Sequence, residues 1–184
     1  MRTSITHPLQ IAEVAAPGGG LIGVTFCPGK CQPAAATGSW FRDLGLDVAA
    51  IQSWGASAVV TLVTDEELRA LRVEGLGEAV RGKGMIWAHL PIEDVRTPTP
   101  DWETNWSVTR TTLHAALDAG GRVLVHCKGG LGRAGLVAAR LLIERGAQPD
   151  WAIAEVRKVR PGAIETSAQE AYLRKLAASL MSGM

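Results

Sequence analysis

The chain has 184 residues, 47% of them hydrophobic and 20% charged, and its 19 basic and 18 acidic side chains leave a net charge of +1. This length predicts one domain with a core of its own, and the charge balance argues against nucleic-acid-binding and membrane-surface proteins, which depend on a basic excess. Three cysteines do not suit a disulfide framework, and the lack of a signal peptide or an apolar membrane span predicts a cytoplasmic protein.

The first half of the chain alternates between apolar runs and helical periodicity. Residues 1–20 have no sustained period and are expected to form a loose or edge arm. Strands are expected over 21–26 and 58–63, the second being continuously apolar and β-branched, as in a strand buried on both faces. A helix is expected over 40–54, and Thr64-Asp-Glu-Glu67 forms a capping box that starts another helix directly after the second strand.

The second half continues the alternation. A strand over 84–90 leads into a loop with three prolines, and a long amphipathic helix follows it. The helices expected here cover 102–119, 132–145, 150–159 and 167–180, with a short strand over 122–125. Strands that alternate with helices predict a mostly parallel central sheet flanked by helices on both faces. We expect one α/β domain over 21–184, preceded by the arm.

The most informative segment lies between a predicted strand and a predicted helix and reads His126-Cys127-Lys128-Gly129-Gly130-Leu131-Gly132-Arg133. A tight loop in that place can direct several backbone N–H groups at one anion, and its glycines permit close approach. Arg133 can clamp two oxygens of a phosphate where the helix begins. Cys127 opens the loop, where the N–H dipoles favour the nucleophilic thiolate, although a lone cysteine there is usually a small buried hydrophobe. The set predicts attack on the phosphorus of a phosphate monoester.

This segment resembles the signature of the cysteine-dependent protein tyrosine phosphatase superfamily. Within the dual-specificity branch of that superfamily, the sequence of this segment is most similar to the kinase-associated phosphatases of the cyclin-dependent kinase inhibitor 3 type. The likeness extends upstream to 89–98, which resembles the family's acid loop, and downstream to 162–173. It implies a metal-independent phosphomonoester hydrolase without a cofactor, in which Cys127 forms a cysteinyl-phosphate that water then hydrolyses. Arg133 and the amides of residues 128–132 would hold the phosphate oxygens.

The resemblance also implies roles for two neighbouring groups. His126 would support the loop and the thiolate by hydrogen bonding, the alternative being a satisfied structural histidine. Asp94 matches the family's general acid, which protonates the leaving oxygen because an alkoxide leaves poorly. Asp101 and Glu93 are alternative donors on the same loop, and solvated loop charges are the structural alternative for all such carboxylates.

Two positions depart from the family pattern. Ala134 stands where the family usually has serine or threonine, whose hydroxyl helps the thiolate to leave, so slower breakdown of the phosphoenzyme is expected. Glu165 stands where the family often has a glutamine that positions the hydrolytic water. Gln169, one helical turn further on, fits the family's next glutamine and can take over that role; otherwise it is an exposed helix residue.

Three functions remain open from the sequence. The leading one is hydrolysis of phosphorylated protein side chains, with tyrosine or dual specificity. Lys128 adds a charge inside the loop that suits small molecules with several phosphates, such as inositol phosphates. Ala134 and Glu165 leave room for a slow phosphate-binding module. The oligomeric state is not predicted.

Four further side chains have competing explanations. Cys27 and Cys31 are best explained as ordinary loop or core cysteines, with a metal site or a disulfide to an oxidised Cys127 as alternatives. Trp102 and Trp106, spaced one helical turn apart directly after the acid loop, either pack that loop or belong to the core.

Overall fold

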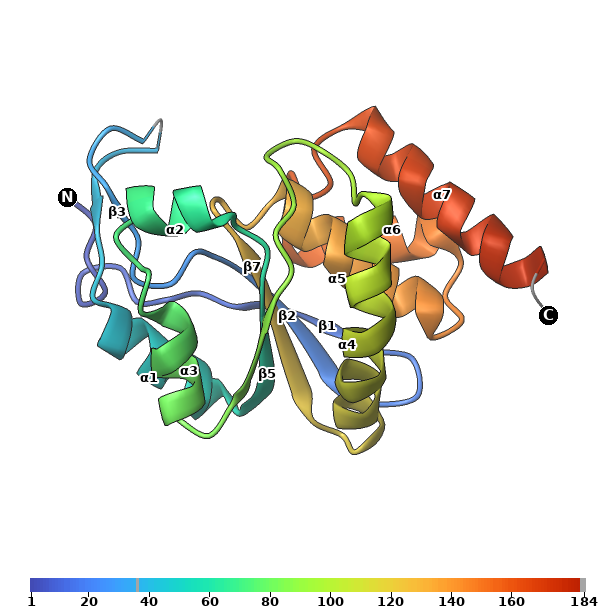
Figure 1. The fold of residues 1–184 in the computed structure, drawn as a ribbon, viewed down its shortest axis with the longest axis horizontal. Helices are drawn as coiled ribbons and strands as arrows, with labels where there is room; N and C mark the ends of the chain where they lie inside the picture. Colours follow the sequence, from blue (N-terminus) through green and yellow to red (C-terminus); the bar gives the residue numbers. More distant parts are fainter. Residues whose placement is uncertain (36, 183–184) are drawn as a thin grey trace.

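A computed structural model describes residues 1–35 and 37–182, and a five-stranded sheet lies at its centre (Figure 1). Its strands are β1 (Ala12–Ala15), β2 (Leu21–Phe26), β5 (Ala56–Thr61), β6 (Ile86–His89) and β7 (Arg122–Cys127). They lie in the order β1-β2-β7-β5-β6, and every pair is parallel except β1 with β2. A separate antiparallel pair consists of β3 (Cys31–Gln32) and β4 (Trp40–Phe41). The predicted, mostly parallel α/β sheet is confirmed.

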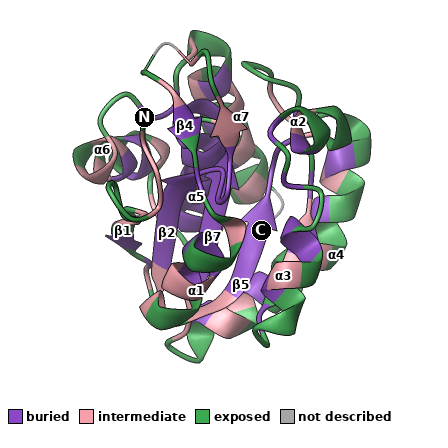
Figure 2. Ribbon diagram, turned by 90° about the vertical axis from the view of Figure 1, so that its left-hand side faces the viewer, coloured by how far each residue is buried: buried purple, intermediate pink, exposed green. Residues whose placement is uncertain are grey.

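Helices cover both faces of this sheet. They are α1 (Leu44–Trp54), α2 (Asp65–Ala70), α3 (Leu76–Gly82), α4 (Pro100–Asp118), α5 (Gly132–Glu144), α6 (Pro149–Val159) and α7 (Ser167–Ser182). Helices α1 and α3 lie on one face, while α4 and α5 cover the other and α6 and α7 pack against α5 (Figure 1). Figure 2 shows the buried strands between helices whose outer faces are exposed. In the described part of the chain, no helix is both long and apolar enough to cross a membrane.

The central position of β7 determines where the candidate site forms. Its neighbours place Phe26 of β2 opposite Cys127 and Thr61 of β5 opposite His126. The carboxyl ends of three parallel strands therefore meet at one edge of the sheet. Two helices, α2 and α5, begin just beyond that edge. This is the place at which open α/β sheets bind their ligands.

The helix predicted over 40–54 begins later than expected, at Leu44. The Asp43 side chain accepts a hydrogen bond from the Leu46 N–H group at 2.8 Å and caps the helix there. The residues before the cap instead pair in the β3–β4 sheet, so the first four predicted helical positions were wrong. Helix α3 was not expected at all, because its short sequence contains two glycines.

The arm predicted over 1–20 contributes the edge strand β1 and is tied down further by a buried ion pair. Arg42 donates hydrogen bonds of 2.7 and 2.8 Å to the two carboxylate oxygens of Asp47. The same guanidinium donates to the carbonyl of His7 at 2.7 Å. Asp47 also accepts the Gly29 N–H group at 2.8 Å, so the arm is held beside the loop that follows β2.

Candidate active site

The loop between β7 and α5 has all four of its carbonyl groups turned outward. Each accepts a hydrogen bond from a neighbouring element or from α5 itself. The Lys128 carbonyl accepts hydrogen bonds from the Cys27 N–H group and from Lys30 Nζ, both at 3.3 Å. The carbonyls of Gly129 and Gly130 accept from Nη2 and Nε of Arg160, at 3.0 and 2.9 Å. The Leu131 carbonyl accepts from the Gly135 N–H group at 2.8 Å. The C=O and N–H groups of a trans peptide point in opposite directions, so the N–H groups of residues 129–132 are directed inward. The loop therefore has the geometry of an anion cradle.

The Cys127 thiol lies within this cradle. Its Sγ accepts a hydrogen bond from the Gly130 N–H group at 3.3 Å, and the residue is only 3% exposed. Gly130 has φ = 71°, and a Cβ atom there would lie 2.5 Å from the carbonyl carbon of Thr25. Only glycine fits both the conformation and the space.

His126 is fully buried behind the loop. The hydroxyl of Thr61 lies 2.8 Å from His126 Nε2 and also accepts the indole N–H of Trp87 at 2.8 Å. Burial lowers the pKa of His126 to about 4, so the imidazole is neutral at pH 7. The network then assigns the Thr61 hydroxyl as donor to Nε2 and the Nδ1–H group as donor to the Cys127 carbonyl, 3.5 Å away. A neutral, doubly anchored ring fits support of the loop rather than proton transfer.

Arg133 is the second residue of α5, and its guanidinium is held from several sides. It donates to both carboxylate oxygens of Glu67, at 2.6 and 2.9 Å, and to the carbonyl of Ile92 at 2.9 Å. Burial alone would lower the pKa of Arg133, but the hydrogen bonds and charge of Glu67 raise it. For Glu67 the two effects are reversed: burial alone would raise its pKa, but the hydrogen bonds from Arg133 hold it below its usual value. The Asp94 carboxylate, 62% exposed, lies 3.0 Å from Arg133 Nη2.

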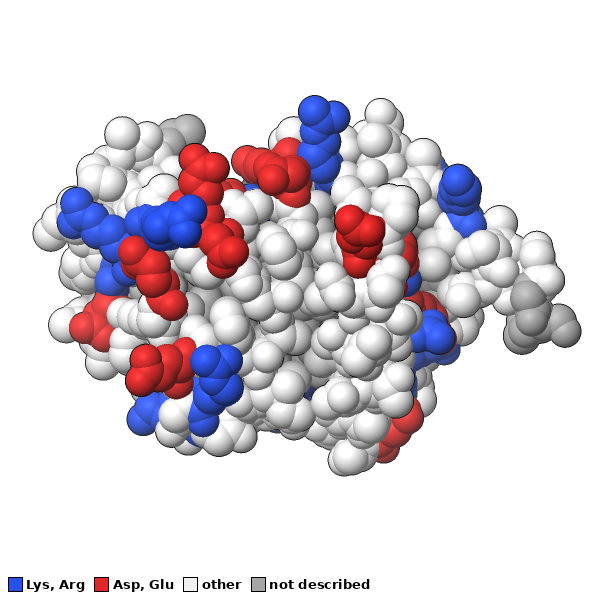
Figure 3. Space-filling view, in the orientation of Figure 1, with Lys and Arg blue, Asp and Glu red and all other residues white. Residues whose placement is uncertain are grey.

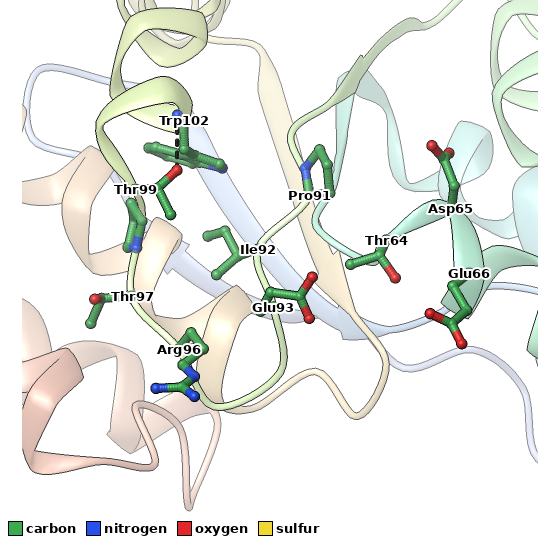
Figure 4. A pocket seen from close by; sticks show the side chains of 11 residues that line it. Thr64, Asp65, Glu66, Pro91, Ile92, Glu93, Arg96, Thr97, Thr99 and Trp102 are labelled. Atoms are coloured by element: carbon green, nitrogen blue, oxygen red, sulfur yellow. Dashed lines mark hydrogen bonds between the residues drawn. The ribbon is translucent and has the colours of Figure 1, made fainter.

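Of the three candidate acids, only Asp94 lines the Cys127 pocket, a hollow of about 230 Å³. Glu93 faces a different pocket, of about 670 Å³, between α2 and the acid loop (Figure 4). Asp101 is an exposed residue of α4 and lines neither pocket. The geometry therefore brings Asp94 together with Cys127 and Arg133 and leaves the two alternatives outside.

The acid loop is anchored at both of its ends. The indole N–H of Trp102 donates to the Leu90 carbonyl at 3.0 Å, and the ring stacks on Trp106, so both tryptophans are core residues and Trp102 also packs the loop. At the other end, the Gln169 side chain donates to the Arg96 carbonyl at 3.3 Å. Between the two anchors, Val95 adopts φ = 56°, which costs an L-residue roughly 1–2 kcal/mol.

Gln169 is completely buried, so its interpretation as an exposed helix residue was wrong. Besides the acid loop, its side chain accepts the backbone N–H of Glu165 at 2.9 Å. This places the Glu165 carboxylate over the start of α5, where Oε2 accepts the Gly132 N–H group at 2.8 Å. A Cβ atom at Gly132 would lie 2.3 Å from Oε2. Glu165 therefore accepts one of the inward N–H groups of the cradle, that of Gly132. Ala134, two residues after Gly132, has no hydroxyl group.

The three thiols of the chain are free. Cys27 is fully buried beside the loop, and burial raises the pKa of its thiol. Cys31 is half-buried in β3. Over residues 1–35 and 37–182, no group of three or more histidine, cysteine, aspartate and glutamate side chains is placed to hold a metal ion.

Comparison with known proteins decides the family. The family model described as Swiss Army Knife protein, DSP-PTPase phosphatase domain, matches residues 42–173. The cyclin-dependent kinase inhibitor 3 of Rattus norvegicus is 37% identical over 148 residues, which cover 77% of this chain and 68% of the relative. The chain belongs to the dual-specificity phosphatase family. The corresponding Homo sapiens protein is 36% identical with the same coverage of both chains.

Solved structures agree with this membership of the dual-specificity phosphatase family. A crystal structure of kinase associated phosphatase, with its catalytic-site cysteine substituted by serine, has a TM-score of 0.82 at 28% identity and covers 96% of this chain and 98% of that one. PTPMT1 in complex with PI(5)P, at 17% identity and a TM-score of 0.67, covers 94% and 98% and shares the fold. The predicted resemblance and the enzyme class, a cysteine-dependent phosphatase, are confirmed.

Several side chains of this dual-specificity phosphatase site, Lys30 among them, were missed from the sequence. Glu67 was recognised only as half of the capping box, which it does form, but its carboxylate also holds Arg133. Arg160 holds two loop carbonyls, and Thr61 anchors His126. One signal existed for Glu67: it follows a buried strand, and the carboxyl ends of parallel strands converge at one edge. Nothing local marks Arg160.

Proposed function

We propose that the chain is a protein phosphatase of tyrosine or dual specificity that hydrolyses phosphomonoesters through a cysteinyl-phosphate. The carrying observation is the Cys127 thiol set within a loop whose carbonyls all point outward and whose amides point inward. Such a cradle stabilises a phosphate around a nucleophile. Three free thiols suit a reducing compartment such as the cytoplasm.

In the first step, Cys127 Sγ attacks phosphorus, an S–P bond forms and the P–O bond to the leaving group breaks. The phosphate oxygens take the place of the exposed Asp94 carboxylate at Arg133 Nη2, while Glu67 keeps the guanidinium oriented. Once released from Arg133, the Asp94 carboxylate takes up a proton from solvent and, as the neutral acid, donates it to the leaving oxygen. The substrate thereby frees its own general acid.

In the second step, water attacks phosphorus, Asp94 takes the proton of the water and the S–P bond breaks. The Gly130 N–H group stabilises the departing thiolate, because Ala134 offers no hydroxyl. The Gln169 side chain is bonded to the Glu165 N–H group and the Arg96 carbonyl. The role of positioning the water for Asp94 therefore falls to Glu165, which also lines the Cys127 pocket.

Glu165→Gln is expected to lower the inhibition constants of phosphate and vanadate by about three- to tenfold. The neutral amide can still accept the Gly132 N–H group but no longer repels an incoming anion. Competitive inhibition assays measure this change. Glu170→Gln, which alters the half-buried ion pairs of α7 with Arg157 and Arg174, is the matched control and should leave both constants unchanged. Unchanged or weaker inhibition of Glu165→Gln would contradict the proposed repulsion.

The function is tested by hydrolysis of p-nitrophenyl phosphate in EDTA. We expect turnover that vanadate inhibits. In a second assay, we expect a higher kcat/KM for phosphotyrosine or phosphothreonine peptides than for inositol phosphates. The reverse order would indicate a small-molecule phosphatase. Vanadate binding without any turnover would indicate a phosphate-binding module instead.

A further inference from the structure

A pocket of about 520 Å³ adjoins the Cys127 pocket and shares four lining residues with it, Lys30 among them. We call it the arm pocket, because the N-terminal arm forms much of its wall. The side chains that give it its character are Arg2, His7, Phe26, Lys30, Trp40 and Arg160. They come from the arm, β2, β4 and the segments after β2 and α6.

The arm pocket is cationic. Over the described residues, no aspartate or glutamate lines it, whereas Arg2, Lys30 and Arg160 do. Lys30 Nζ lies 4.4 Å from the centre of the Trp40 ring, and the Arg2 guanidinium lies 4.9 Å from the same ring. Lys30 and Arg160 donate their hydrogen bonds to carbonyls of the cradle loop. These cations contact aromatic rings and backbone oxygens rather than carboxylates.

Lys30 is the central residue of this arrangement. It is only 4% exposed, and burial lowers its pKa to about 8, so it is still mostly protonated at pH 7. A buried ammonium group without a carboxylate partner is costly to keep. Because Lys30 lines both pockets, an anion in either of them is attracted to it.

The opposite side of the acid loop has the opposite charge. The pocket between α2 and that loop is lined by Asp65, Glu66 and Glu93, and among the described residues Arg96 is its one cation (Figure 4). Figure 3 shows acidic side chains over α2 and the acid loop, with basic side chains beside them. A substrate segment that crosses Cys127 therefore meets positive charge on one side and negative charge on the other.

We propose that the arm pocket binds a second anionic side chain, phosphorylated or acidic, that lies within a few residues of the scissile phosphate in a protein substrate. It rests on the proposed phosphatase function and specifies its substrate class. Two hollows that share one wall suit two side chains of one extended segment, whose residues advance about 3.3 Å each. The Trp40 and Phe26 rings supply an apolar surface for the atoms between the two anions.

The test is a set of peptides with one phosphotyrosine and a phosphoserine moved from three residues before it to three residues after it. We expect kcat/KM to rise about tenfold over the singly phosphorylated peptide on one side only. The rise should shrink at high salt. Arg2→Gln and Lys30→Met should each reduce it to about twofold or less. Lys30→Arg and Arg110→Gln, which removes an exposed cation of α4, should retain it.

Activity on p-nitrophenyl phosphate separates this inference from the function beneath it. Arg2→Gln should leave that activity unchanged, since the small substrate does not reach the arm pocket. No preference at any peptide position, or a preference that survives both Arg2→Gln and Lys30→Met, would overturn the second-anion site while leaving the phosphatase intact. A preference confined to inositol bisphosphates would overturn the assignment to protein substrates. Absence of hydrolysis of p-nitrophenyl phosphate would instead refute the proposed function.

Discussion

Cys127→Ser is expected to reduce kcat on p-nitrophenyl phosphate by about a thousandfold or more. The hydroxyl of serine is far less ionised than a thiol, and His126 cannot take its proton, because Nε2 already accepts the Thr61 hydroxyl and Nδ1 carries a proton donated to the Cys127 carbonyl. Binding of phosphate should persist, because the inward amides and Arg133 remain in place. Calorimetry of phosphate binding and steady-state kinetics measure the two effects separately.

The chain provides a matched control for this substitution. Cys31→Ser changes a half-buried thiol of β3 that does not line the Cys127 pocket, and full activity is expected. Retained hydrolysis in Cys127→Ser would show that the nucleophile is another group. Loss of phosphate binding together with activity would show that serine disturbs the cradle rather than the chemistry.

Asp94→Asn is expected to lower kcat/KM on phosphothreonine peptides by about a hundredfold and on p-nitrophenyl phosphate by much less. An alkoxide needs a proton to leave, whereas the nitrophenolate leaves without one. Steady-state kinetics on both substrates measures the change.

Two neighbouring carboxylates serve as controls for this acid. Glu93→Gln alters the pocket between α2 and the acid loop, and Asp101→Asn alters the first turn of α4. Each should keep kcat/KM within about twofold of the parent value. A larger loss of kcat/KM in Asp101→Asn than in Asp94→Asn would show that Asp101 is the general acid, although it is Asp94 that contacts Arg133 in the structure.

Local pattern explains what was predictable. The run from His126 to Arg133 has its nucleophile, its glycines and its guanidinium within eight consecutive residues, so one strand–loop–helix unit positions all of them. The capping box at Thr64 and the alternation of strands with helices are equally local. The sequence favoured Asp94 over Glu93 and Asp101 only through its resemblance to the family's acid loop. The structure places the Asp94 carboxylate beside Arg133.

Long-range packing decided the rest. Because β7 lies between β2 and β5, Glu67, which follows β5, comes within hydrogen-bond distance of Arg133, which follows β7. The segment after α6 brings Arg160 into contact with the loop carbonyls. Such contacts join residues tens of positions apart, and no local periodicity encodes them, because strand order depends on which faces bury one another.

The charge of the chain shows the same division. From the sequence alone, a net charge of +1 argues against a broadly basic surface. Only the fold brings Arg2, Lys30 and Arg160 to one pocket beside the cradle and sets Asp65 and Glu66 in another. Charges of both signs cancel in a sum, while the electrostatic potential at a pocket depends on which of them lie within a few ångströms. Composition therefore determines the total charge, and the tertiary structure determines where it acts.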